Sequence, residues 1–91
     1  MAKLELILKH KWYDMIALGE KPEEYRDLTE HYKKMLEGKQ YDRVRFHRGY
    51  TSTTITYQIR EIVIGRGNPE WGAPDRDVYI IRLGQCVGCS A

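Results

Sequence analysis

A long segment of strand-forming residues, 53–65, constrains the fold of this chain more than any other feature. Side chains alternate between the two faces of a strand, so residues on one face share a parity. The large apolar residues lie at odd positions in the first half of this segment and at even positions in the second half: Ile55, Tyr57 and Ile59, then Ile62 and Ile64. The change of phase around Arg60 and Glu61 predicts a bulge or bend, which is typical of a strand that curves around a small barrel.

The rest of the chain predicts four more strands and two short helices. Apolar runs or alternation indicate strands over residues 4–8, 23–26, 41–48 and 78–83, the last buried on both faces. Apolar positions at helical spacing indicate two helices, one with Trp12, Met15 and Ile16 and one with Leu28, Tyr32, Met35 and Leu36. Gly19 and Gly38 should end these helices, and Asp27 should cap the second. Because both helices come early and do not form βαβ units, we expect an α+β fold with about five strands in a curved sheet or small β-barrel.

Size and composition restrict the class of protein. The 91 residues fit one domain, spanning 1–91. Hydrophobic residues make up 42% and charged residues 31%, a balance that is typical of globular rather than disordered chains. No apolar run approaches the roughly 20 residues that span a bilayer. The N-terminus lacks the apolar stretch of a signal peptide, so we expect a cytoplasmic protein with no membrane partner.

Cys86 and Cys89 form a single Cys-x-x-Cys pair near the C-terminus. A structural zinc ion needs four ligands, and no histidine has a finger-like spacing to this pair. A redox motif of this kind needs a helix after the pair, for which no room remains. We therefore expect residues from about 85 to 91 to be a mobile tail with reduced thiols, and we expect no metal and no cofactor.

A densely charged run, residues 19–26, is the strongest candidate for a functional site. Its sequence Gly-Glu-Lys-Pro-Glu-Glu-Tyr-Arg combines a helix terminator with a proline that disfavours helical geometry at Lys21. It predicts a helix end, a tight corner and a strand in which Glu24 and Arg26 face the same side. Lys21, at the corner, can swing to join them. The three groups suit a phosphate and a base edge; alternatively, they only pair with one another and hold the corner shut.

The spacing Gly19-x-Lys21-x-x-Glu24-x-Arg26 resembles the G-x-K-x-x-E-x-R signature of the ASCH domain family, within the PUA-like superfamily. The order of the expected strands and helices around it is similar as well. The resemblance implies a PUA-like β-barrel. It also implies a binding module for single-stranded RNA or a nucleotide, modified bases included, because PUA-like domains are recurrent readers of such ligands.

The resemblance leaves an enzyme open as the alternative. Some small ASCH proteins are amidohydrolases of N4-acetylcytidine with a Thr nucleophile, at the position that Glu24 occupies here, and this replacement disfavours that activity. Another ASCH branch is reported as ribonuclease, for which Lys21 with Tyr25 or Tyr50 would be the candidate set. In an enzyme, Lys21 and Glu24 would be the catalytic residues.

Other basic and aromatic residues extend the candidate site. The charge of +2 is too small to indicate a nucleic-acid binder by itself, so the distribution of charge decides. Arg43, Arg45 and His47 share one strand face, which is otherwise the solvated side of an edge strand. Trp12 is better explained as core than as a stacking surface. The residues expected to contact RNA or a nucleotide are Lys9, Lys21, Glu24, Arg26, Arg45, His47, Tyr50 and Trp71. Monomer and weak dimer both stay open.

Overall fold

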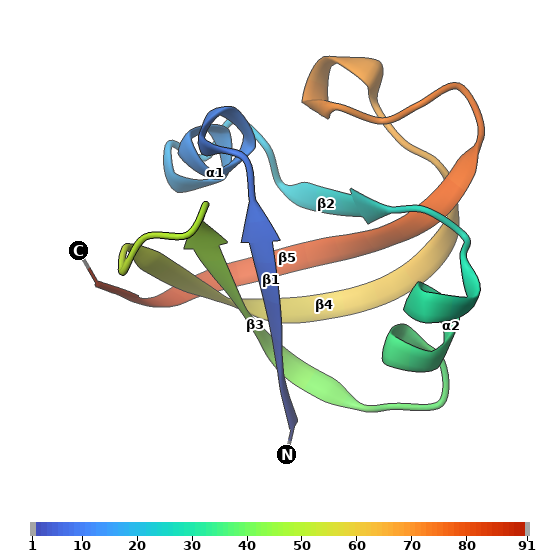
Figure 1. The fold of residues 1–91 in the computed structure, drawn as a ribbon, viewed down its shortest axis with the longest axis horizontal. Helices are drawn as coiled ribbons and strands as arrows, with labels where there is room; N and C mark the ends of the chain where they lie inside the picture. The colour runs from blue at the N-terminus through green and yellow to red at the C-terminus, as the bar shows by residue number, and fades with distance from the viewer. Residues whose placement is uncertain (1, 91) are drawn as a thin grey trace.

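One five-stranded sheet with two α-helices makes up the protein (Figure 1). The computed structural model describes the backbone of residues 2–90 and the side chains of residues 3–89. In chain order the elements are β1 (Ala2–Leu8), α1 (His10–Ala17), β2 (Glu23–Arg26), α2 (Glu30–Leu36), β3 (Tyr41–Arg48), β4 (Thr54–Arg66), the 3-10 turn η1 (Pro69–Trp71) and β5 (Asp77–Ser90).

The sheet is mixed and curls into a half-barrel. Its strand order is β1-β3-β4-β5-β2, in which β1 runs parallel to β3 and all other neighbours are antiparallel. The two edge strands, β1 and β2, come from the N-terminal part of the chain and approach each other across the opening of the curl (Figure 1). This confirms the α+β class with a curved sheet and two early helices.

The bend predicted in the long strand is present in β4. Its register against β5 shifts between Thr56 and Tyr57, again between Tyr57 and Ile59, and again between Ile59 and Glu61. The first two shifts leave an extra residue on β5, and the third leaves one on β4. Because this bulge of β4 lies between Ile59 and Ile62, both pack against the main core although their spacing of three would place them on opposite faces of a regular strand.

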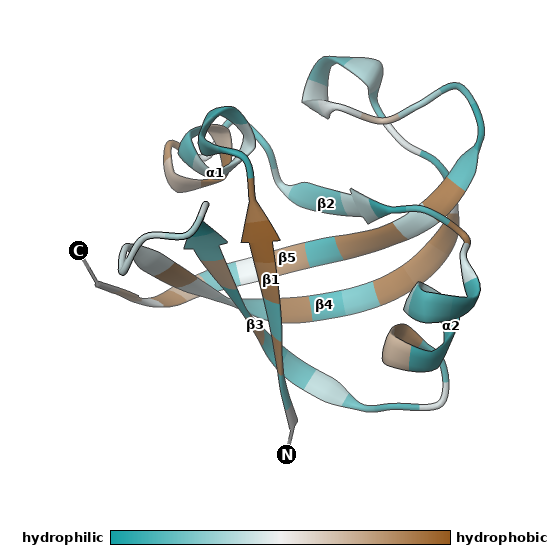
Figure 2. Ribbon diagram, in the orientation of Figure 1, coloured by the Kyte–Doolittle hydropathy of each residue, from teal (hydrophilic) through white to brown (hydrophobic). Residues whose placement is uncertain are grey.

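Burial follows the alternation that the sequence predicts. Leu4, Leu6 and Leu8 of β1 are buried in the main core, together with residues of α1, β3 and β5. Figure 2 shows apolar stretches on β1, β4 and β5. Strand β5 packs with both of its faces. Tyr79, Ile81 and Leu83 enter the main core, and Val78 and Ile80 enter a smaller cluster with Tyr25 and Ala73. The prediction that residues 78–83 lie in a strand buried on both faces is confirmed.

The second helix begins later than the sequence predicts. Thr29, not Asp27, is its N-cap residue, and the Thr29 hydroxyl accepts a hydrogen bond from the backbone N–H of Tyr32 at 3.2 Å. Leu28 therefore precedes the helix, and its side chain is 48% exposed instead of packing in the apolar stripe. Asp27 pairs with Arg76 (2.8 Å), which leaves the cap to the hydroxyl.

The expected tail is wrong as a description of residues 85–90, because β5 continues through them to Ser90. Cys89 lies opposite Ile55 and Cys86 opposite Tyr57, so this segment pairs with the first residues of β4. Both thiols are free and exposed.

The expectation that residues 41–48 form an edge strand is also wrong, since β1 and β4 flank β3. Within the described residues, no helix is both long and apolar enough to cross a membrane.

Candidate ligand cleft at the seam of the half-barrel

The charged run forms the corner between α1 and β2. Gly19 adopts a φ of 81°, in the left-handed region that favours glycine, and reverses the chain at the end of the helix. The backbone N–H groups of Glu20 and Lys21 then both donate to the carbonyl of Met15, at 2.9 and 3.1 Å. Pro22 follows, and β2 starts at Glu23. The corner is therefore tied to the helix end, which sets the direction in which the Lys21 side chain leaves it.

Lys21, Glu24 and Arg26 form one continuous chain of ion pairs. The Lys21 ammonium lies 3.1 Å from Glu24 Oε1, and Arg26 Nη2 lies 2.8 Å from Glu24 Oε2. Each oxygen of the carboxylate thus meets a different cation. The expectation that these three groups converge is confirmed.

The Lys21 ammonium is covered, contrary to the role of direct ligand contact expected for it. Its side chain is 1% exposed. Nζ donates to the Trp71 carbonyl at 2.7 Å and lies 4.6 Å from the centre of the Tyr25 ring. Desolvation by this burial lowers the pKa of Lys21, although the neighbouring Glu24 opposes the shift. Lys21 therefore positions Glu24 from behind and does not line the cleft.

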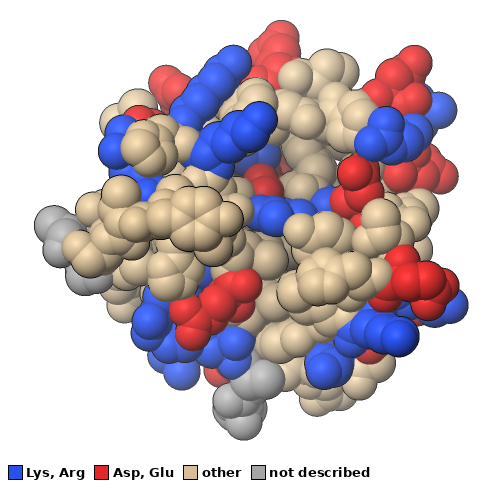
Figure 3. Space-filling view, in the orientation of Figure 1, with Lys and Arg blue, Asp and Glu red and all other residues tan. Residues whose placement is uncertain are grey.

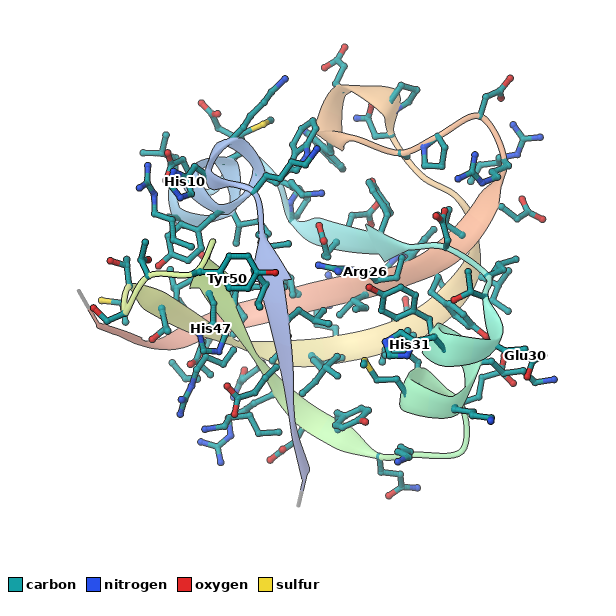
Figure 4. All side chains as sticks on the ribbon, viewed as in Figure 1. His10, Arg26, Glu30, His31, His47 and Tyr50 are labelled. Carbon is teal, nitrogen blue, oxygen red and sulfur yellow. The ribbon has the colours of Figure 1, made fainter. Side chains whose placement is uncertain are left out.

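Arg26 bridges the opening of the half-barrel. From β2, its Nη2 donates to the Ile7 carbonyl on β1 (3.2 Å), and its Nη1 donates to the Tyr32 hydroxyl on α2 (3.0 Å). Figure 4 shows Arg26 between β2 and β1. Among the described residues, the buried Nε of Arg26 has no hydrogen-bond partner, so its N–H is an unused donor.

The line along which β1 and β2 face each other across the opening of the half-barrel is called the seam below. A cleft of about 510 Å³ lies at the seam, between β1, α1, β2, α2 and the loop before β5. Figure 3 shows this face hollowed near its centre, with charged atoms at the bottom of the hollow. Polar and charged groups that line it are Lys9, Glu24, Arg26, Asp27 and Arg76, and aromatic rings that line it are Trp12, Tyr25 and Tyr32. This volume is within the range of small-molecule sites.

Three of the eight residues expected to contact a nucleotide line this cleft: Lys9, Glu24 and Arg26. Arg45 and His47 instead point outward from β3 and share one partner, Glu5, whose Oε1 lies 3.8 Å from Arg45 Nη1 and 2.8 Å from His47 Nε2. Tyr50 is 94% exposed on the turn after β3. Trp71 is half-buried against the smaller apolar cluster and contributes its carbonyl to Lys21.

Sequence reasoning missed four residues of the cleft. Trp12 is half-buried and lines the cleft, so the assignment to the core covers only part of its surface. Tyr32 was placed in an apolar helix stripe, but its hydroxyl accepts from Arg26. Asp27 and Arg76 form an ion pair at the mouth and come from segments that are distant in the chain. Helical periodicity placed Trp12 and Tyr32 on the two helices, whereas no local sequence pattern points to Arg76.

The fold and the cleft together define a class: a small α+β half-barrel with a charged cleft walled by aromatic rings. Within residues 3–89, no group of three or more His, Cys, Asp or Glu side chains is arranged to hold a metal ion. Comparison of the chain with family models, with curated proteins and with solved structures found no match in any of the three.

Proposed function

We propose that this protein is an ASCH-type, PUA-like domain that binds a nucleotide, or one nucleotide of a single-stranded RNA, in the seam cleft. One observation carries the proposal: cations, a carboxylate and aromatic rings line the same cleft, as a phosphate, a base edge and a base face require. The free, exposed thiols of Cys86 and Cys89 are in keeping with a reducing compartment, and we place the protein in the cytoplasm.

Each part of a nucleotide has a counterpart in the cleft. Lys9 is exposed, and among the described residues it has no acidic partner, so its charge is available to a phosphate. The Trp12 ring, which the exposed Lys11 ammonium approaches to 4.6 Å, lines the cleft and is the surface that a base would stack on. Glu24 is held in place by two cations and still has lone pairs that can accept from an exocyclic amine, as carboxylates do with cytosine N4.

Hydrolysis ranks second. The residue in the nucleophile position of the amidohydrolases is Glu24, and both of its oxygens are engaged by cations. Lys21 would have to act on a substrate from a position that is 1% exposed. Incubation with N4-acetylcytidine and with a labelled RNA oligomer separates the two functions. Released cytidine or cleaved RNA that is lost in Glu24→Gln would place catalysis first.

Binding is tested by titrating isotope-labelled protein with the four nucleoside 5′-monophosphates and with N4-acetylcytidine while recording amide and indole chemical shifts. We expect the shifts to concentrate at Trp12, Gly72 and the end of β1, which surround the cleft. Unchanged spectra with every nucleotide, together with no binding of single-stranded RNA by anisotropy, would refute the proposal.

A matched pair of lysine variants checks where the ligand binds. Lys9→Ala and Lys34→Ala remove the same charge from exposed positions, but only Lys9 lines the cleft. We expect Lys9→Ala to weaken binding and to reduce the slope of log K against log salt by about 0.7, the value for one phosphate contact on a single strand. Lys34→Ala should leave both quantities near those of the wild type.

A further inference from the structure

We propose that the ligand is an RNA strand of at least two nucleotides, and that the second nucleotide occupies a subsite built by Tyr50 and His47 beside the cleft. This inference rests on the proposed function, since it extends the ligand that the cleft holds. It specifies what that function leaves open: whether the natural ligand is a free nucleotide or a polymer.

The subsite is a second hollow on the same face of the molecule. It has a volume of about 400 Å³ and is lined by Glu5, Ile7, His47, Gly49, Tyr50 and Thr51. Ile7 lines both the cleft and this hollow. Its carbonyl accepts a hydrogen bond from Arg26, which lines the cleft. In Figure 4, Tyr50 and His47 lie on one side of β1 and Arg26 lies on the other. A strand leaving the cleft over Ile7 therefore enters this hollow.

Tyr50 is presented to solvent by a turn whose own backbone is held. The N–H of Gly49 donates to the Leu8 carbonyl (2.8 Å), and the hydroxyl of Thr51 donates to the Arg48 carbonyl (2.6 Å). Between these anchored residues, the Tyr50 side chain is 94% exposed. An aromatic ring in this position adds little to the core, whereas it provides a stacking surface for an unpaired base.

The cations Arg45 and Lys3 lie near the same hollow. Arg45 and the imidazole of His47 share the carboxylate of Glu5, which is itself about half exposed. Lys3 lies on the same outward face of β1 and helps to lower the pKa of Glu5, after the larger effect of the His47 hydrogen bond. Arg45 and Lys3 together therefore outnumber the carboxylate of Glu5, and the phosphate that joins two nucleotides would find a favourable field.

The experiment measures affinity against ligand length. Unlabelled 5′-phosphorylated adenylates, cytidylates and uridylates of one, two and four nucleotides compete with a fluorescent single-stranded RNA for the wild type and three variants. Tyr50→Ala removes the proposed stack, and Tyr50→Phe keeps the ring. Leu18→Ala truncates another exposed side chain that lines neither cavity. Thermal unfolding of each variant shows that the fold is kept.

We expect wild-type affinity to rise from one to two or more nucleotides in at least one series. Tyr50→Ala should remove roughly 5- to 150-fold of that rise, the range for one base–aromatic stack, while its affinity for mononucleotides is unchanged. Tyr50→Phe and Leu18→Ala should keep the rise. Equal affinity for all lengths, or a rise that persists in Tyr50→Ala, would overturn the second subsite and leave the cleft proposal standing. Absence of binding at every length would overturn both.

Discussion

The ammonium group of Lys21 lies behind the wall of the cleft, with Glu24 Oε1 at 3.1 Å and the Trp71 carbonyl at 2.7 Å. A buried charge is costly unless partners replace its hydration, and these two groups supply that replacement. Trp71 belongs to η1 and Glu24 to β2, so the ammonium also fixes the loop before β5 relative to the edge of the sheet. At the residue scale, the alternative that Lys21 holds the corner shut fits its position better than contact with a ligand.

Substitution of Lys21 should therefore lower stability. In Lys21→Met, Glu24 loses one of its two cations and the Trp71 carbonyl loses its donor, so we expect the free energy of unfolding to fall by about 3 kcal/mol. For a domain of this size, the thermal midpoint should drop by more than about 10 °C. Calorimetry measures this drop, and Lys34→Met provides an exposed lysine as control. A midpoint within a few degrees of the wild type would show that the buried pair is dispensable.

Tyr79 should make stability depend on alkaline pH. The hydrogen bond that its hydroxyl donates to Glu37 raises the pKa of Tyr79 to about 12, above the ordinary value of 10.0. Between these pH values the unfolded chain loses a proton that the folded protein keeps, so stability must fall as pH rises through this window. Burial also raises the pKa of other tyrosines, which strengthens the decline: Tyr13, Tyr25 and Tyr57.

The contribution of Tyr79 is isolated by comparing the thermal midpoint at several pH values from 10 to 12 in the wild type and in Tyr79→Phe. The variant should be less stable at neutral pH, because it lacks the bond to Glu37, and its midpoint should fall less steeply with pH. The exposed Tyr50→Phe should follow the wild type. If Tyr79→Phe had the same slope as the wild type, the hydrogen bond to Glu37 would not control this titration.

At the scale of the elements, local sequence patterns predicted those features whose causes are local. The phase change in residues 53–65 marked the bulge of β4 between Ile59 and Glu61, because alternation is a property of a few neighbouring residues. The cap of α2 was assigned to Asp27 in error, since two side chains near the helix start can both accept from a backbone N–H and tertiary pairing with Arg76 decides between them. Likewise, exposed residues at the end of β5 give no strong pattern, and pairing with β4 determines their conformation.

Removal of residues 85–91 tests the role of that last part of β5. The truncation exposes one side of β4 from Thr54 to Tyr57, which includes the buried Ile55. We expect a loss of at least about 2 kcal/mol from the broken ladder, and a thermal midpoint lower by roughly 8 °C or more. Amide exchange should become faster at Ile55. A full-length Cys86→Ser, Cys89→Ser variant is the control for loss of the thiols, and an unchanged midpoint on truncation would favour a mobile tail.

In the molecule as a whole, the candidate cleft lies where the sheet fails to close. Residues of the N-terminal strand, both helices and the loop before β5 line the cleft at the seam. They include residues far apart in the chain, such as Ile7 and Arg76. Lys21, Glu24 and Arg26 could be predicted because they lie within one short run. The contribution of Arg76, and the outward direction of Arg45 and His47, depend on the curl of the sheet, which no local pattern specifies.

We expect Arg26 to affect both stability and nucleotide binding, because it links the strands on the two sides of the seam. Its planar guanidinium reaches Glu24, Ile7 and Tyr32 at once, and a lysine ammonium cannot reproduce this geometry although it keeps the charge. In Arg26→Lys, we expect amide exchange to become faster along β1 and β2, and stability to fall by about 1–3 kcal/mol. Nucleotide affinity should fall more than in Lys9→Ala, because the walls of the cleft lose their link.

Arg45→Lys is the matched control. Among residues 3–89, the ion pair of Arg45 is with the half-exposed Glu5, at 3.8 Å, and exposed ion pairs contribute little. It should leave exchange at the seam and affinity for mononucleotides unchanged. Two measurements then separate the roles of Arg26. Suppose that amide exchange along β1 and β2 became faster in Arg26→Lys but nucleotide affinity stayed at the wild-type value. Arg26 would then have a structural role only, linking β1 to β2, and the ligand would have to bind elsewhere. If both change together, the opening of the sheet is also the opening of the site.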